Sequence, residues 1–407
     1  MKKLYRREAY LRKVRPFYHS DLIKVITGIR RCGKSCLLET IMEELRESGV
    51  PPKDILYINL DTRNYLSVKR PEQLAEAIDS FGNDGSKKYL FVDEVQNVNG
   101  FEQIINAYRE EGNYSIFITG SNSYLLSGEL VTKLTGRYVE ILLFPLNFHE
   151  YLEMKRLYGQ EVLGLAEEFT RYLRGGGFPQ AVEFPDAAAQ AAYVANVMEQ
   201  ILRKDVALRN KIRNRLAFDK VMPYLIQNFG SSTNLDNIVK YLKNTNQAVV
   251  KRETLKRYLD ILLAARILYK CQRFDLKSKR SLRGEEKYYL ADTGIYFASN
   301  TDVRINYGPV LENVLYIYLL SQGYKVSVGR VGALECDFIA QRDGIYYYLQ
   351  VAMSIADPQT EEREYASLEA IHDNYPKYLF TLDPLLQRRN GIRHLNLMEF
   401  LATDGEL

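Results

Sequence analysis

Short runs of apolar residues alternate with amphipathic stretches through the first 150 residues. An uninterrupted apolar run of about four to eight residues is typical of a buried strand, and apolar residues three and four apart are typical of a helix with one buried face. Strands that alternate with helices predict a parallel sheet covered by helices, and therefore an α/β fold. The predicted strands are LIKVIT at 22–27, ILYINL at 55–60, YLFVDE at 89–94, SIFITG at 115–120 and YVEILLF at 138–144.

The pattern changes character after residue 150. A helical pattern continues to about residue 225 and is interrupted at Gly175 to Pro179. Two more helices, at Leu235–Lys243 and Arg252–Ala265, precede two strand-like runs that flank the polar segment KSKRSLRGEE, which is the element order of a winged helix. The last hundred residues return to α/β alternation. We therefore expect a core domain at 1–150, a helical lid at 151–225, a winged helix at 226–300 and an α/β domain at 301–407.

Composition adds limits on class and location. The chain has 407 residues, of which 46% are hydrophobic and 26% charged, so most of it should fold into globular domains. No run of about 18 apolar residues predicts a membrane span, and the basic N-terminus lacks the apolar stretch of a signal peptide. The four cysteines show no metal-binding spacing, which favours free thiols in a reducing compartment. We expect a cytoplasmic protein.

The segment GIRRCGKS at residues 28–35 follows the first predicted strand and opens the first amphipathic helix. It matches G-x-x-x-x-G-K-[ST], in which Gly28 and Gly33 let backbone N–H groups face phosphate oxygens. Lys34 supplies a positive charge to the phosphates, and Ser35 offers a hydroxyl to Mg²⁺. The helix adds the positive end of its dipole. The predicted nucleotide-binding residues are Gly28, Ile29, Arg30, Arg31, Cys32, Gly33, Lys34, Ser35 and Cys36.

A second candidate site follows the buried strand YLFVDE. Asp93 would lie at the carboxyl end of this strand, where ligands bind in open α/β sheets, and would hold Mg²⁺. Glu94 is suited to polarise the attacking water, although a solvated acid at a strand end is the alternative. The Asp-Glu pair separates this chain from P-loop kinases and most GTPases. No Asn-Lys-x-Asp motif is present, so ATP is favoured over GTP.

These motifs resemble those of the AAA ATPases. In that family a polar residue ending the strand after the Asp-Glu strand senses the γ-phosphate, which points to Ser121, with Asn122 next. The family often carries an arginine finger just before the following strand, where this chain has Arg137. Such a residue serves the ATP of a neighbouring subunit, so the resemblance implies a homo-oligomer. The alternative is that Arg137 caps a helix or pairs with a surface acid.

The resemblance extends over nearly the whole chain. It is similar to a broad prokaryotic family that joins an AAA core to a winged helix and to a C-terminal domain resembling restriction endonucleases. The phrases that carry the similarity are TGIRRCGKS, FVDEVQN, FITGSNSYLLSGEL, GRYVEI, GGGFPQAV, KYYLADTGI and ECDFIA.

Basic residues concentrate in the predicted winged helix. Between Lys240 and Lys287, fourteen Lys and Arg stand against five Asp and Glu, a net of +9 in a chain whose total is +4. Phosphate contacts from such residues would bind double-stranded DNA with little sequence preference. A protein partner is the alternative, because winged helices also serve protein contacts. The candidate DNA contacts are Arg252, Lys256, Arg257, Lys279 and Arg280, with Lys277 and Arg283 on the same wing.

The C-terminal part carries an incomplete version of a metal-dependent nuclease site. Glu312 and Asp337 fall where the restriction-type pattern has acids, but Gln350 and Ala352 stand where Glu-x-Lys is expected. Gln350 brings no negative charge and Ala352 cannot activate water, so we expect an inactive domain that binds a partner. Lys377 or another lysine would have to replace the missing one.

The functional hypothesis is an ATP-driven conformational switch. Mg-dependent ATP hydrolysis would use Lys34, Glu94, Ser121 and Arg137, with Ser35 and Asp93 at the metal ion. The switch would act on DNA through the winged helix. The alternative is a signalling or protein-interaction ATPase, and an ATP-dependent nuclease is the third hypothesis.

Overall fold

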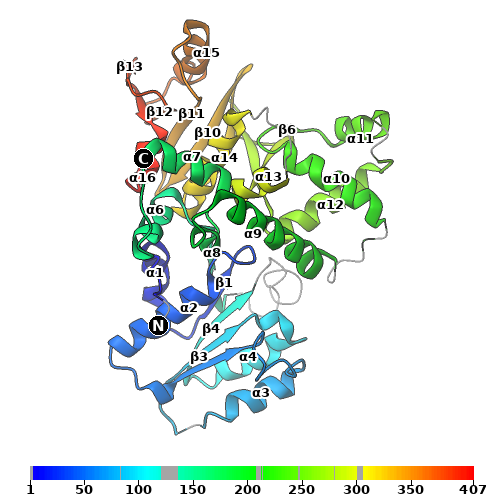
Figure 1. The fold of residues 1–407 in the computed structure, drawn as a ribbon, viewed down its shortest axis with the longest axis vertical. Helices are drawn as coiled ribbons and strands as arrows, with labels where there is room; N and C mark the ends of the chain where they lie inside the picture. Colours follow the sequence, from blue (N-terminus) through cyan, green and yellow to red (C-terminus); the bar gives the residue numbers. More distant parts are fainter. Residues whose placement is uncertain are drawn as a thin grey trace. The chain divides into compact units, whose positions relative to one another are not determined.

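A computed structural model describes residues 3–82, 84–120, 136–207, 212, 214–245, 248–278, 280–299 and 306–407. The chain divides into two compact units, residues 1–143 and 144–407, and within the described residues each unit is built on one β-sheet (Figure 1).

The first unit contains a five-stranded sheet in the order β2-β3-β4-β1-β5, and every neighbouring pair is parallel. This confirms the parallel sheet predicted from the sequence. Its strands are nearly continuous apolar runs, as expected for strands buried on both faces. They are β1 Ile23–Thr27, β2 Ile55–Asn59, β3 Lys88–Asp93, β4 Tyr114–Gly120 and β5 Tyr138–Leu142.

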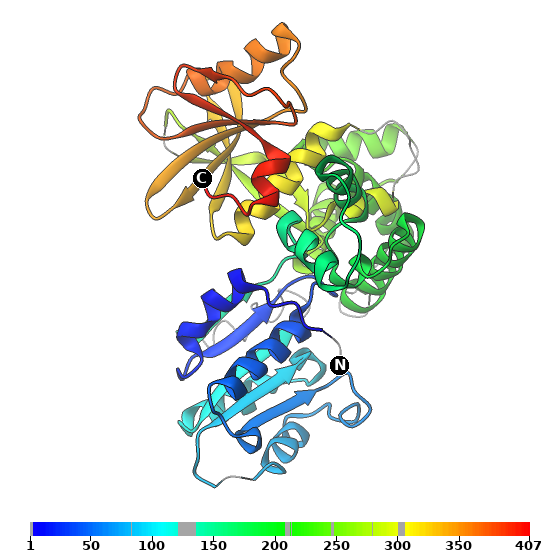
Figure 2. The ribbon, with the colours of Figure 1, turned by 60° about the vertical axis from the view of Figure 1, so that its left-hand side comes forward.

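Helices cover this sheet. The helix α2 (Lys34–Glu47) packs against β4 through a buried apolar face, and Figures 1 and 2 show it running alongside the parallel strands. The helices α3 (Pro71–Asp79) and α4 (Phe101–Glu110) pack on each other and contribute to the same core as β2, β3 and β4.

The N-terminal segment is part of the first unit. It forms α1 (Glu8–Val14) and a short 3-10 turn, Arg15–Phe17. Arg15 pairs with Glu44 of α2 at 2.7 Å, and the hydroxyl of Tyr18 donates to the same carboxylate at 2.7 Å. These contacts fix the segment next to the helix that follows the phosphate-binding motif.

Helices make up much of the second unit before residue 300. They are α6 Phe148–Leu157, α7 Leu165–Gly175, α8 Pro179–Val182, α9 Ala187–Gln200, α10 Arg215–Gln227, α11 Leu235–Asn244, α12 Arg252–Ala264 and α13 Thr293–Ser299. The glycine-rich segment that interrupts the helical pattern separates α7 from α8. The next two predicted helices correspond to α11 and α12.

One sheet spans most of the second unit, in the order β13-β14-β12-β11-β10-β9-β7-β8-β6. The hairpin β7–β8 expected for a winged helix is present, but β7 also pairs in parallel with β9, from Gln272 opposite Ser327 to Asp275 opposite Arg330. The sheet therefore continues across residue 300, and the division into a winged helix and a separate C-terminal domain stays a prediction. The strands are β6 Ser232–Thr233, β7 Leu268–Asp275, β8 Arg280–Leu290, β9 Lys325–Val331, β10 Leu334–Arg342, β11 Ile345–Val351, β12 Lys377–Thr381, β13 Arg388–Arg389 and β14 Ile392–Asn396.

Three helices pack on the C-terminal strands. The apolar helix α14 (Tyr307–Ser321) contacts β8, β9, β10 and β11, and α15 (Pro358–Glu369) packs on β10, β11 and β12. The last helix, α16 (Leu397–Ala402), follows β14. In the described part of the chain, no helix is both long and apolar enough to cross a membrane.

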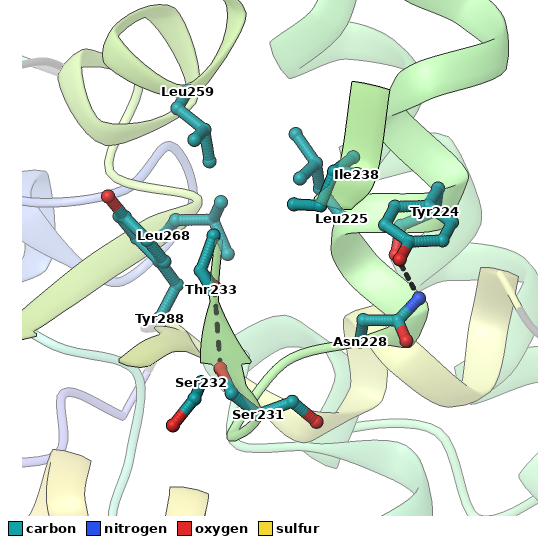
Figure 3. A pocket seen from close by; sticks show the side chains of 10 residues that line it. All are labelled: Tyr224, Leu225, Asn228, Ser231, Ser232, Thr233, Ile238, Leu259, Leu268 and Tyr288. Atoms are coloured by element: carbon teal, nitrogen blue, oxygen red, sulfur yellow. Dashed lines mark hydrogen bonds between the residues drawn. The ribbon is translucent and has the colours of Figure 1, made fainter. Parts of the chain in front are cut away.

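A small cavity lies among the elements of the predicted winged helix (Figure 3). Its volume is about 70 Å³, room for about two water molecules and too little for a nucleotide. It is lined by Tyr224, Leu225, Asn228, Ser231, Ser232, Thr233, Ile238, Leu259, Leu268 and Tyr288.

Candidate functional site

The phosphate-binding motif forms the loop between β1 and α2, as the sequence predicts. Gly28 has a φ of 152°, and a Cβ at this position would lie 2.2 Å from the carbonyl oxygen of Leu143. Gly33 has a φ of 103° and is the N-cap of α2, so the backbone is in the left-handed region directly before Lys34. Both glycines are therefore needed for the backbone path that brings the loop to the start of the helix.

Two buried cations hold the carbonyl groups of this loop. The ammonium of Lys34 donates to the carbonyl oxygens of Gly28 at 3.1 Å and Ile29 at 3.2 Å. The guanidinium of Arg7 donates to the carbonyl oxygen of Cys32 at 3.3 Å. The sequence did not distinguish Arg7 from the other basic residues near the N-terminus.

Cys32 contributes its backbone to this loop, and its side chain is fully buried. Burial raises the pKa of its thiol, although the charges of Lys34 and Arg7 lower it, and the charge of Glu94 adds to the rise. The thiol is therefore an uncharged group that fills space in the loop.

Asp93 ends β3 and is almost fully buried. The hydroxyl of Thr119, on the neighbouring strand β4, donates to Asp93 Oδ1 and accepts from the backbone N–H of Glu94 at 2.9 Å. Tyr57 and Asn59, on β2, donate to Asp93 Oδ2 at 3.2 Å and 3.3 Å. Asn59 and Thr119 could have been predicted as partners of Asp93, because both are polar residues near the ends of the strands that flank β3.

Glu94 has an unusual backbone conformation. Its φ of 57° and ψ of 45° place it in the left-handed region, which few residues other than glycine adopt. Its carboxylate accepts a hydrogen bond from the side-chain amide of Gln96. A residue held in this region costs about 1–3 kcal/mol, and such residues cluster at functional sites.

The structure describes the predicted arginine finger but not the predicted γ-phosphate sensor. Ser121 and Asn122 lie outside the described residues. Arg137 donates to the side-chain oxygen of Asn106 at 2.9 Å and pairs with Glu110 at 3.3 Å. The structure thus shows the surface-acid pairing that the sequence left open as the alternative.

The position of Arg137 excludes a role at its own phosphate loop. It directly precedes β5, whose first residue, Tyr138, is opposite Ile23 at the beginning of β1. The loop begins at Gly28, after the other end of β1, a separation of about 16 Å along the strand.

Comparison with known proteins identifies the first unit. Residues 20–152 match the family model described as an AAA domain. An uncharacterised protein of Haemophilus influenzae is 36% identical over 376 residues, 92% of each chain, and this chain belongs to the same family. This protein carries an AAA-type P-loop ATPase domain.

Other similarities extend beyond the ATPase core. Residues 166–302 match a domain of unknown function. An uncharacterised protein of Methanocaldococcus jannaschii is 29% identical over 308 residues, 74% of this ATPase and 67% of the relative. The Walker-type ATPase of Pyrococcus abyssi shares the fold, with a TM-score of 0.51, 15% identity, and coverage of 73% of this chain and 96% of that one.

The second unit of this ATPase brings together the residues predicted for a nuclease-type site. Asp337 accepts from the backbone N–H of Val351 at 2.9 Å, and its own N–H donates to Gln350 Oε1 at 3.2 Å. Gln350 Nε2 donates to Glu364 at 2.8 Å. The pKa of Asp337 is raised well above its ordinary value, first by burial and then by the nearby charge of Glu312.

These residues do not fit a divalent metal ion. The lysine at this site is Lys287 of β8, whose ammonium pairs with Glu312 at 3.1 Å and Glu335 at 2.9 Å. Lys377 instead donates to the carbonyl oxygen of Asp373. Within the described residues, no group of three or more His, Cys, Asp or Glu side chains is arranged to hold a metal ion.

Proposed function

We propose that the first unit binds Mg-ATP and hydrolyses it at the loop between β1 and α2. The observation that supports this most directly is the pair of acids at the end of β3, which one hydroxyl, that of Thr119, connects to β4. In this proposal Lys34 exchanges its backbone carbonyl partners for phosphate oxygens. Glu94 accepts a proton from the attacking water.

Asp93 and Ser35 are the residues proposed to hold Mg²⁺. A hydroxyl and a carboxylate are oxygen ligands of the kind this ion prefers, with water and phosphate completing its shell. Asp93 is 1% exposed, and Tyr57, Asn59 and Thr119 donate to it as neutral groups. Among the described residues no Lys, Arg or His pairs with it. A buried carboxylate without a protein cation is suited to a bound one. Mg²⁺ supplies positive charge that stabilises the phosphate oxygens.

Two substitutions test this proposal. Lys34→Ala should abolish ATP binding. Glu94→Gln should leave ATP binding intact and lower kcat by about 100-fold or more, because the amide cannot accept the proton. Glu72→Gln, an exposed acid on α3, is the matched control and should leave turnover unchanged. Undiminished turnover in Glu94→Gln would remove Glu94 from the mechanism.

Arg137 is proposed to act on the ATP of a neighbouring subunit. Its distance from its own phosphate loop and its 42% exposed side chain support this role. A mixing experiment tests it. Arg137→Ala and Lys34→Ala should each be inactive alone, whereas mixed oligomers should regain activity, because an intact Arg137 then faces an intact phosphate loop. Mixed oligomers that form but stay inactive would contradict this role.

A second proposal couples ATP turnover to double-stranded DNA through α12 and the β7–β8 hairpin. Lys256, Arg257 and Arg280 are exposed, as a phosphate-binding surface requires. Arg252 is also exposed but pairs with Asp236 at 3.3 Å. Lys279 lies outside the described residues.

Part of the basic segment is neutralised within the protein. Arg273 pairs with Glu335, and Lys287 pairs with Glu312 at 3.1 Å; both acids lie outside the segment in which the charge was counted. The charge available to DNA is therefore smaller than the net of +9 counted from the sequence. This reduction keeps the alternative open, in which the surface binds a protein partner.

ATP turnover measured with and without duplex DNA at low salt distinguishes the two. DNA binding would be supported if DNA stimulates turnover and this stimulation decreases with salt. Lys256→Glu and Arg257→Glu should each lose the stimulation, whereas the control Lys220→Glu on α10 should keep it. Turnover that ignores DNA would favour a protein partner, sought with the Glu94→Gln variant as a trap. Metal-dependent DNA cleavage abolished by Asp337→Ala would instead support the nuclease hypothesis.

A further inference from the structure

The second unit contains a partly buried ion cluster centred on the buried ammonium of Lys287. This residue lies on β8, and its side chain is 7% exposed. Its ammonium lies 3.1 Å from Glu312 Oε2, on α14, and 2.9 Å from Glu335 Oε1, on β10. The hydroxyl of Tyr289 donates to the same oxygen of Glu312 at 2.9 Å. Asp337 lies two residues after Glu335 on the same strand, β10.

Irregular strand pairing occurs at both sides of this cluster. The register of β10 against β9 shifts between Cys336 and Ile339, the segment that contains Asp337. The register of β7 against β8 shifts between Cys271, which is opposite Lys287, and Arg273. Such irregularities bend a strand and change the direction of its side chains.

The charges of the cluster balance. Glu312 and Glu335 carry two negative charges, and Lys287 and Arg273, which pairs with Glu335, carry two positive ones. Burial and the charge of Glu312 raise the pKa of Asp337 well above its ordinary value, which favours its neutral form. A buried cluster is stable only when its charges are paired in this way.

We propose that Lys287 is a built-in cation that takes the place of a divalent metal ion among Glu312, Glu335 and Asp337. An ammonium satisfies buried carboxylates as a metal ion does, but it cannot lower the pKa of water or accept an oxygen ligand. The cluster is therefore a structural junction that connects β8 to α14 and β10. Gln350 and Ala352, which lack the groups of a nuclease centre, agree with this assignment.

Replacing the ammonium tests the proposal. Lys287→Met keeps the length of the side chain and removes its charge, which leaves the acids without a cation. The full-length variant, without nucleotide, should have a lower Tm than the wild type and should regain about 3 °C or more in millimolar Mn²⁺. The Tm of the wild type should not respond to Mn²⁺ at this cluster, and adding Asp337→Asn to the variant should remove its response.

Lys270→Met is the matched control. Lys270 lies on the partner strand β7, and its ammonium pairs with Glu286 with about a third of the side chain exposed. This variant loses the same charge from the same hairpin, and its Tm should respond to Mn²⁺ no more than that of the wild type. A folded Lys287→Met protein that ignores Mn²⁺, or a wild type that responds as strongly as the variant, would overturn the proposal.

A second comparison holds even if Lys287→Met does not fold. In a protein whose cation is Lys287, Glu312→Gln removes a direct ion-pair partner and should lower Tm. Asp337→Asn removes no ion-pair partner of Lys287 and should change Tm little. In a metal site both acids would be ligands. The proposal would also be contradicted if the Tm of both variants decreased equally and Mn²⁺ restored neither of them.

Discussion

Lys24 is a fully buried lysine and the second residue of β1. Its ammonium donates to the hydroxyl of Ser115 at 2.8 Å and to the carbonyl oxygen of Ser20 at 3.3 Å, and it lies 4.4 Å from the ring centre of Phe117. Burial, and then repulsion from Lys87, lowers its pKa to about 7. The folded state therefore tolerates this charge poorly.

Lys24→Met should raise the free energy of unfolding. In the wild type, stability should increase by up to about 1.4 kcal/mol per pH unit between roughly pH 7 and 10, because there the unfolded chain binds a proton that the folded chain does not. The gain from Lys24→Met should thus be largest at pH 7 or below and shrink toward pH 10. Urea denaturation at several pH values measures it, with the exposed Lys69→Met as control. Equal or lower stability at every pH would contradict the argument.

The functional residues that could be predicted from the sequence are those that belong to a local sequence motif. Lys34 and Asp93 follow from the spacing of glycines and from a carboxylate at the end of a buried strand. Arg7 and Lys287 reach their sites through contacts between distant segments, and no local pattern marks them. Arg7 in particular is one of many basic residues near the N-terminus.

The hydroxyl of Thr119, on β4, connects this strand to the end of the neighbouring strand β3. Thr119→Val keeps the shape of the side chain but removes the group that connects Asp93 with the backbone of Glu94. We expect kcat to fall by about 10- to 100-fold with little change in KM for ATP, because misplaced catalytic groups slow the chemical step. Thr119→Ser should restore most of the rate. A variant that loses ATP binding instead would indicate a structural role.

Asp292 connects the glycine-rich segment after α7 to the start of α13. Its buried carboxylate accepts from the backbone N–H groups of Gly177 at 2.6 Å and Gly294 at 2.8 Å. A Cβ on Gly176, whose φ is 75°, would lie 1.8 Å from the same carboxylate. Burial raises the pKa of Asp292 to about 6, although the two N–H groups lower it.

This raised pKa predicts a pH dependence. The contribution of Asp292 to stability is complete below about pH 4 and should decrease by up to about 1.4 kcal/mol per unit as the pH rises to 6. Asp292→Asn should remove this slope and also destabilise the fold by about 1–3 kcal/mol, because an amide cannot accept both hydrogen bonds. Thermal denaturation between pH 4 and 7 measures both effects, and the exposed Asp260→Asn is the control. An unchanged slope would exclude Asp292 as its source.

At the scale of the whole molecule, the continuous sheet of the second unit determines where the chain can be divided. A chain ended after residue 300 would lose β9 and leave the edge of β7 unpaired, and an exposed strand edge promotes aggregation. We expect this fragment to be aggregated or protease-sensitive by size-exclusion chromatography and limited proteolysis. Co-expression with residues 301–407 should restore solubility. A stable, monomeric fragment would instead support a boundary at residue 300.

Most helices and strands could be predicted from the sequence, but not the pairing of β7 with β9. Periodicity describes which face of an element is buried, whereas the choice of strand partner depends on packing between segments about 55 residues apart. The polar segment between the predicted strands illustrates the same limit. Its composition predicts the tip of a hairpin. In the structure β8 already begins at Arg280, because pairing with β7 extends the strand.

The buried ammonium of Lys287 makes one part of the protein independent of metal supply. A covalently attached cation is present once in every molecule, whatever the concentration of free ions around it. Among the residues that the structure describes, no such resident charge pairs with Asp93, and the proposed ATP site depends on magnesium from solution. Treatment with a chelator should therefore stop ATP turnover while leaving the C-terminal sheet folded, which separates the two halves of the molecule by their need for metal.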